Sequence, residues 1–80
     1  MKKLEFKPPA LRQWFKLSSD VRDRIDGKLA EYVSTGKGDV RQLKGRSGAR
    51  LRVGDWRVLF IDDGETITVT AVGHRRDVYE

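Results

Sequence analysis

The feature that most constrains the fold is an alternating stretch broken by a two-residue turn signal. Apolar and basic side chains alternate over residues 49–53, Gly54-Asp55 is a turn favoured in β-hairpins, and a strand-like run covers residues 56–61. Directly opposed residues of a hairpin share one face, so this turn sets Arg52 against Arg57. The pattern predicts an antiparallel pair with an apolar face and a basic face.

Three arginines occupy the basic face: Arg50, Arg52 and Arg57. Like charges opposed across a ladder destabilise it, so Arg52 facing Arg57 indicates an anion that binds between them. The alternative interpretation is that these arginines form an ordinary solvated face of a small basic sheet. In both interpretations we expect this face to be left open.

A further strand extends the predicted sheet, because Asp63-Gly64 is a turn signal and residues 66–72 alternate. This turn would set Phe60 against Ile67 and Trp56 against Ala71, with Thr68 and Thr70 beside the arginines. The strand would end near the Gly54-Asp55 turn. The chain after it would therefore bring more polar groups to the arginines: His74, Arg75, Arg76 and Tyr79.

The first half of the chain predicts one short strand and two helices. Residues 3–7 form the strand, Pro8-Pro9 suit the first turn of a helix, and Leu11, Trp14 and Phe15 form its apolar stripe. Ser18 or Ser19 begins a second helix, which ends near Gly36 and has an apolar stripe at Val21, Ile25, Leu29, Tyr32 and Val33. Residues 35–48 hold four glycines and predict a basic loop with one turn over residues 39–43.

The order of elements is β-α-α-β-β-β, and 80 residues suffice for a single domain over residues 1–80. We expect an α+β fold in which a helical hairpin packs on one face of a mainly antiparallel four-stranded sheet.

Charge narrows the classes of function. The chain carries a net charge of +5, and residues 41–57 hold six cations against one carboxylate. Such density favours a nucleic acid, another polyanion or an acidic protein partner. The chain has no cysteine and one histidine, so neither a metal site nor a cofactor is expected. No apolar run is long enough for a signal peptide or a membrane span, which predicts a cytoplasmic protein without a membrane partner.

The run "LKGRSGARLRVGDWRVLFIDDGETITVTAVGHRRDVYE" resembles the RelE/ParE superfamily of toxins from type II toxin–antitoxin systems. The segments "LKG", "LRVGDWRV" and "VGHRRDVY" are the most specific, and the resemblance implies a RelE-like fold. The superfamily contains ribosome-dependent mRNA endonucleases similar to RelE and gyrase poisons similar to ParE. RelE-like members cut mRNA in the ribosomal A site, by attack of the ribose 2′-OH on the adjacent phosphate.

Carried over to this chain, the RelE pattern implies that Arg57 and Arg75 hold the scissile phosphate and that Tyr79 stacks on a nucleotide. Arg50 and Arg52 stand where RelE has lysines, one of them implicated in proton abstraction. Arginine keeps its proton, so the general base is unassigned and His74 is the candidate. The other phosphate-binding candidates are Lys44, Arg46 and Arg76.

The resemblance favours an endoribonuclease toxin that acts on ribosome-bound mRNA and is held inactive by a cognate antitoxin, RelB-like or other. The alternatives are a ParE-like gyrase inhibitor and a catalytically degenerate member that only binds RNA or antitoxin.

Overall fold

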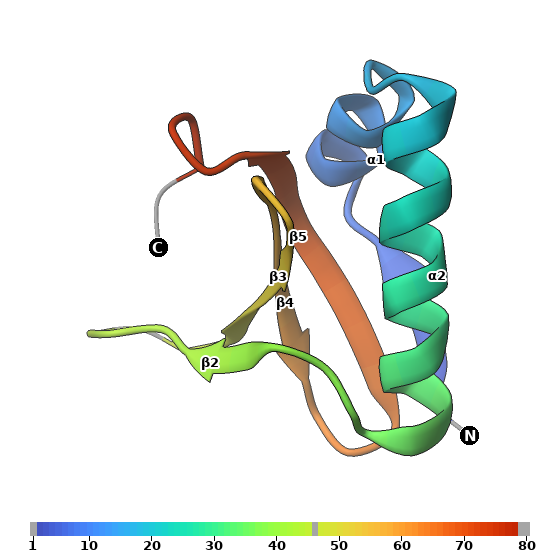
Figure 1. Cartoon of the computed structure of the whole chain (residues 1–80). Coiled ribbons are helices and arrows are strands. Elements are labelled where there is room, and N and C mark those ends of the chain that lie inside the picture. Colours follow the sequence, from blue (N-terminus) through green and yellow to red (C-terminus); the bar gives the residue numbers. More distant parts are fainter. Residues whose placement is uncertain (1, 46, 79–80) are drawn as a thin grey trace.

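The computed structural model describes residues 2–45 and 47–78, which form two layers (Figure 1). The helices pack on one face of a five-stranded sheet, whose strand order is β1-β5-β4-β3-β2. All neighbouring strands are antiparallel except β1, which runs parallel to β5. The elements in chain order are β1 (Lys3–Phe6), α1 (Pro8–Phe15), α2 (Ser19–Thr35), β2 (Val40–Gln42), β3 (Ala49–Val53), β4 (Trp56–Asp62) and β5 (Thr66–His74). The expected α+β architecture is confirmed, with one strand more than predicted.

The ends of the helices follow their sequence signals. Two prolines open α1, and the Ser18 hydroxyl accepts a hydrogen bond from the Val21 N–H at 3.4 Å to cap α2. Gly36 ends α2 with φ 74°, in the left-handed region that favours glycine. Ile25 and Leu29 are fully buried at the centre of the predicted α2 stripe.

The predicted stripe of α1 is wrong in two of its three members. Leu11 is 40% exposed and Phe15 63% exposed, whereas Ala10 is fully buried. Trp14 is partly buried against the core, and its Nε1 donates to Asp26 of α2 at 3.1 Å. α1 packs on β5, and the small side chain of Ala10 is the one that this helix buries.

The predicted hairpin is confirmed residue by residue. Arg52 lies opposite Arg57, and Arg50 lies opposite Leu59. The predicted loop before the hairpin is wrong in part, because residues 40–42 form the edge strand β2. Arg41 of that strand lies opposite Arg50, so the basic face extends one strand further than expected.

The register between β4 and β5 also differs from the prediction. Phe60 lies opposite Val69 and Trp56 opposite His74, because the connecting loop is longer than two residues and the ladder is irregular between Leu59 and Phe60. The irregularity moves Ala71 to the face of Leu59, and Gly73, instead of a threonine, lies opposite Arg57. Val72 lies beyond the last β1 residue paired with β5, and its N–H donates to Gln13 Oε1 of α1 at 2.9 Å.

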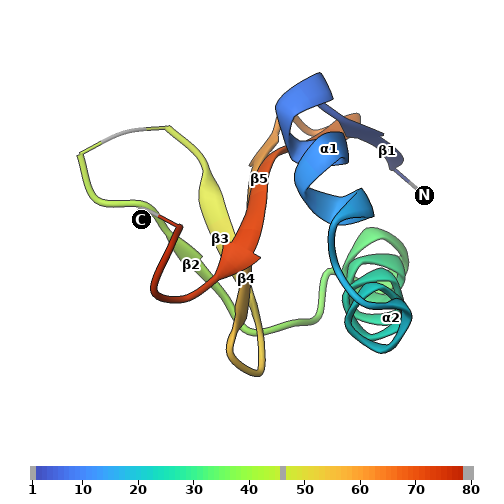
Figure 2. The same cartoon turned by 90° about the horizontal axis from the view of Figure 1, so that it is seen from above.

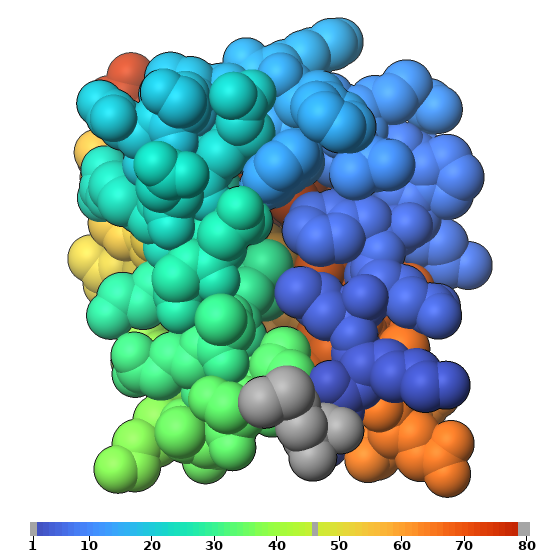
Figure 3. Space-filling view, turned by 90° about the vertical axis from the view of Figure 1, so that its right-hand side faces the viewer, coloured from blue at the N-terminus to red at the C-terminus, as the bar shows by residue number. Residues whose placement is uncertain are grey.

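The core lies between the helices and the sheet. Its fully buried large side chains are Ile25, Leu29, Leu51, Val58, Phe60, Ile67 and Val69. Seen from the helical side, α1 and α2 with β1 cover most of this face of the molecule (Figure 3). Neither helix is long and apolar enough to cross a bilayer, within the part of the chain that the structure describes. The opposite face of the sheet is left for the arginines.

Candidate functional site

One end of the sheet gathers the Gly54-Asp55 turn, the start of β4 and the end of β5. Arg57 lies on the face away from the helices but is only 7% exposed. Its Nη1 donates to the carbonyl of Gly54 at 2.9 Å and to that of Trp56 at 3.0 Å. The hairpin turn therefore fixes this guanidinium group in place, and the expectation of a fully open arginine face is wrong at Arg57.

The chain after β5 explains this burial. Arg57 lies opposite Gly73, and a Cβ on Gly73 would stand 2.5 Å from Val78 Cγ2. The amides of Asp77 and Val78 donate to the carbonyl of His74 at 2.8 and 3.1 Å, so this segment turns back over the sheet. Figures 1 and 2 show it on the side away from the helices. Glycine at position 73 lets the segment lie close to the arginine row.

The same turn holds Arg75. The Arg75 N–H donates to the carbonyl of Asp55 at 2.8 Å, and Arg75 Nε lies 3.8 Å from Asp55 Oδ1. Both side chains are more than half exposed, so the ion pair contributes little and the backbone bond fixes the position. The turn thus positions two arginines, Arg57 and Arg75, that are far apart in sequence.

His74 lies beside this turn, and its ring forms a T-shaped pair with that of Trp56 at a centroid separation of 5.4 Å. Its Nδ1 accepts a hydrogen bond from the Arg76 N–H at 3.2 Å. An acceptor at Nδ1 places the proton of the neutral ring on Nε2. In this tautomer Nε2 can donate to an anion but cannot take a proton.

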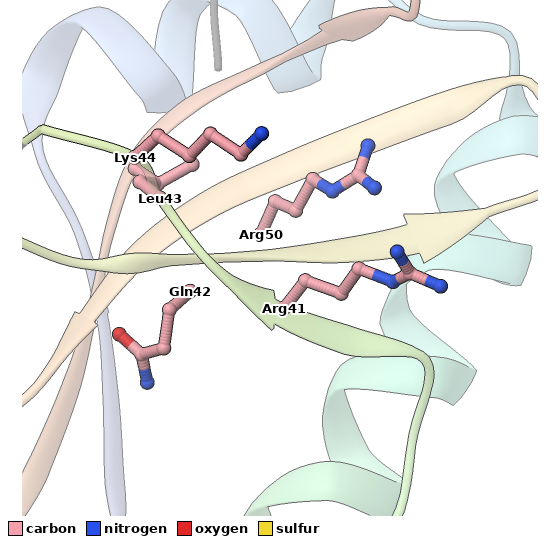
Figure 4. Close-up of a pocket in the computed structure, with 5 residues that line it drawn as sticks. All are labelled: Arg41, Gln42, Leu43, Lys44 and Arg50. Carbon is pink, nitrogen blue, oxygen red and sulfur yellow. The ribbon is translucent and has the colours of Figure 1, made fainter.

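The remaining cations follow the face toward the β2 edge. Arg52 is exposed and its Nε lies 4.0 Å from Asp39 Oδ2, which is a weak surface pair. Arg41, Lys44 and Arg50 line a hollow of about 410 Å³ together with Gln42 and Leu43. In Figure 4 these three cations extend to one side of the strands, and Gln42 extends to the other.

The other end of the sheet holds the groups with shifted pKa values. The hydrogen bond from Lys2 Nζ at 2.6 Å lowers the pKa of Asp62 and raises that of Lys2, and the Gly64 N–H lowers the pKa of Asp62 further. The N–H groups of Thr66 and Glu65 lower the pKa of Asp63. These carboxylates stabilise the β4–β5 turn.

Most of the predicted site residues therefore lie on one face or at one end of the sheet. Arg57, His74 and Arg75 meet at the hairpin turn, and Arg76 follows them on the surface. Arg50, Arg52 and Lys44 continue along the basic face. Arg46 and Tyr79 lie outside the described residues.

Two cations were missed from the sequence. Arg41 joins the basic face through β2, and the Arg24 guanidinium of α2 reaches the hairpin turn, with Nη2 2.6 Å from where a Cβ would stand on Gly54. Arg41 was counted among the cations of residues 41–57, but without a strand at residues 40–42 the sequence could not place its side chain on the basic face of the sheet. No sequence signal distinguishes Arg24 from the other charges of an exposed helix side.

The sequence matches a family of known toxins. Residues 4–79 match the model of a family described as the ParE toxin of a type II toxin–antitoxin system, parDE. The chain is 31% identical over 77 residues to the mRNA interferase toxin RelE of Escherichia coli K12, covering 90% of this chain and 81% of RelE.

The fold is similar to those of solved toxin structures. The isolated E. coli RelE toxin aligns with a TM-score of 0.78 and 26% identity, over 92% of this chain and 84% of RelE. The toxin in the intact E. coli RelBE toxin–antitoxin complex aligns with a TM-score of 0.74 and 29% identity, over 92% of this chain and 96% of that one.

Proposed function

The chain belongs to the RelE/ParE superfamily of toxins from type II toxin–antitoxin systems, and from that premise we propose that it is an mRNA endoribonuclease acting on the ribosome. The observation that carries the proposal is the hairpin turn that holds Arg57 and Arg75 together. Guanidinium groups suit a phosphate whose negative charge grows during reaction, and here one turn bonds to the side chain of Arg57 and to the backbone of Arg75. The 31% sequence identity to an mRNA interferase toxin also supports RNA cleavage as the activity.

In the proposed reaction, the ribose 2′-OH attacks the adjacent phosphorus in the ribosomal A site. A 2′-O–P bond forms as the 2′-OH proton passes to water, and the P–O5′ bond breaks as O5′ takes up a proton from water. The products carry a 2′,3′-cyclic phosphate and a 5′-hydroxyl. Arg57 and Arg75 stabilise the pentavalent phosphate, and Tyr79 stacks on a neighbouring base. The turn already fixes the Arg57 guanidinium group, but Arg57 is only 7% exposed beneath the segment that follows β5. This segment must therefore move aside for a phosphate to reach it.

His74 enters the proposal as a hydrogen-bond donor. Its Nε2–H suits a phosphate oxygen, while Nδ1 accepts from the Arg76 N–H. Nε2 could act as the general base only in the other tautomer, and Nδ1 could do so only with loss of its hydrogen bond from the Arg76 N–H. Arg50 and Arg52 keep their protons, so they contribute phosphate binding and not proton abstraction.

We further propose a cognate antitoxin as partner, since the RelBE complex pairs a similar toxin with one. The free surface has two features to cover, namely the basic face of the sheet and the exposed side chains of Leu11 and Phe15 on α1. An amphipathic acidic helix has the chemistry for both. Purification from the native operon should yield a complex; toxin alone at every salt concentration would contradict this.

The second candidate function is gyrase inhibition, which the ParE description of the matching family favours. A gyrase poison acts by protein contact and gives paired arginines only an electrostatic role. The two candidates therefore differ in what they require of Arg75.

The test of the nuclease is an Arg75→Ala variant assayed on translated mRNA. The Arg75 side chain is 53% exposed, so the variant should fold, and its cleavage rate should fall by about 100-fold or more if the guanidinium group stabilises the transition state. Arg12→Ala, with the same loss of charge on the exposed side of α1, is the matched control and should cut normally. Equal cleavage by the two variants would refute the assignment.

A further inference from the structure

Two neighbouring hollows lie on the open face of the sheet, beyond the row formed by Arg52 and Arg57. The first is the cationic hollow of about 410 Å³ lined by Arg41, Lys44 and Arg50 (Figure 4). Arg41 is exposed and makes no ion pair or side-chain hydrogen bond within the described ranges 2–45 and 47–78. Its charge lies directly opposite that of Arg50, and an anion bound beside both side chains would reduce the repulsion between them.

The second hollow is mainly apolar and measures about 260 Å³. Leu43 lines both hollows and so joins them. Leu59 and Ala71 lie opposite each other across β4 and β5 and both line this hollow. The other lining residues are Ser47, Phe60, Ile61 and Thr70. Apolar walls with a few hydroxyl groups beside them suit a flat aromatic ring system.

The position of the cationic hollow relates it to the paired arginines. Arg50 lies two residues before Arg52 on β3, which is a separation of roughly 6.6 Å at the usual rise of a strand. Consecutive phosphates of an extended single strand are separated by a comparable distance. A strand of RNA with one phosphate at the Arg52–Arg57 row would thus bring the next phosphate to the Arg41–Arg50 row.

We propose that the two hollows together form a nucleotide subsite for single-stranded RNA, in which Arg41, Lys44 and Arg50 bind the phosphate and the apolar hollow takes the base. The subsite rests on the proposed function, and it adds Arg41 and the Leu43 surface to the substrate-binding residues. It would hold the message one nucleotide away from the phosphate bound by Arg57 and Arg75. An acidic peptide would also satisfy the cations, but it carries no flat aromatic base for the apolar hollow beside them.

The test measures binding and not cleavage, so that it can fail independently of the nuclease assignment. The probe is a fluorescent single-stranded RNA heptamer, titrated with purified protein at several salt concentrations from about 50 to 200 mM. Each phosphate contact contributes about 0.7 to the slope of log K against log salt for a single strand. Arg41→Ala should therefore lower that slope by about 0.7 and weaken binding at low salt by about five- to tenfold. Arg12→Ala removes the same charge from α1 and should change neither.

A second series tests the base. Heptamers with one abasic position keep every phosphate, and one such position should weaken binding to the wild-type protein several-fold. Leu43→Ala should reduce that difference, and Arg41→Ala should preserve it.

Three results would overturn the subsite: equal salt slopes for Arg41→Ala and Arg12→Ala, no abasic position that weakens binding, or an Arg41→Ala variant impaired only in binding to the antitoxin. Loss of the subsite with normal mRNA cleavage would leave the nuclease intact. Normal RNA binding without any cleavage would reject the nuclease and retain the subsite.

Discussion

Replacing Arg57 by alanine should unfold the protein more readily as well as remove a phosphate contact. The buried guanidinium group donates to the carbonyls of Gly54 and Trp56 at 2.9 and 3.0 Å. Hydrogen bonds from a charged donor contribute about 1.5–3 kcal/mol each, and two that share one Nη1 contribute less than twice that. We expect Arg57→Ala to lower the free energy of unfolding by about 2–4 kcal/mol. An 80-residue domain has only about 4–12 kcal/mol in total.

Urea unfolding followed by circular dichroism measures this loss, with Arg52→Ala as the control. Arg52 lies directly opposite Arg57 but is mostly exposed, so its removal should cost less than about 1 kcal/mol. A loss below about 1 kcal/mol for Arg57→Ala would refute the structural role of its guanidinium group. The consequence for function is that lost toxicity in Arg57→Ala does not by itself identify a catalytic residue, and Arg75 is the cleaner position to test.

Three other predictions concern the surroundings of the site. Gly73→Ala should place a methyl group against Val78 and displace the segment that follows β5. Single-turnover mRNA cleavage should then slow by about tenfold or more, with little change in ribosome binding. An unchanged cleavage rate would show that the position of this segment is not needed for cleavage. His74→Gln keeps a donor near the Nε2 position but cannot take a proton, so cleavage by this variant should exceed that by His74→Ala; equal loss in both would favour the general base instead. The pKa values of Asp62 and Asp63 are lowered in the folded protein, so both carboxylates stabilise the fold at any pH above their usual pKa of 3.8. This stabilisation is lost as the pH falls through the lower folded pKa values. Asp63→Ala should therefore flatten the acid side of a plot of unfolding free energy against pH.

The part of the fold that the sequence predicts best is the β3–β4 hairpin. A two-residue turn and strict alternation leave one register, because a slip by one residue would bury arginines in the core. The helix ends are equally local, since a proline pair, a serine cap and a glycine in the left-handed region act within a few residues.

The errors arise where distant parts of the chain decide the structure. Residues 40–42 are too few to show alternation, and they become a strand only because β3 offers an open edge. The irregularity at Leu59 and Phe60 is invisible in the even alternation of β5, although it moves Ala71 to the other face. Leu11 and Phe15 have helical spacing, but α1 packs on β5 and buries Ala10 instead.

In the candidate site, too, some features could be predicted from the sequence and others depend on distant parts of the chain. The arrival of residues 73–76 beside the hairpin turn followed from the lengths of the strands, and it is confirmed by the bond from the Arg75 N–H to Asp55. The burial of Arg57 did not follow, because it depends on a chain reversal at Gly73 and Val78 that has no signal in the alternation. The roles proposed for Arg57, His74, Arg75 and Tyr79 remain predictions.

Primer extension on a translated message, with and without the purified protein, tests the central claim most directly. If the chain is an mRNA endoribonuclease, new 3′ ends appear at ribosomal A-site positions with the wild-type protein and are absent with Arg75→Ala. A parallel incubation of the protein with gyrase and supercoiled DNA should then give no cleaved complex. An uncut message in the presence of folded protein, together with cleaved gyrase–DNA complexes, would contradict the account and assign the toxin to the gyrase inhibitors.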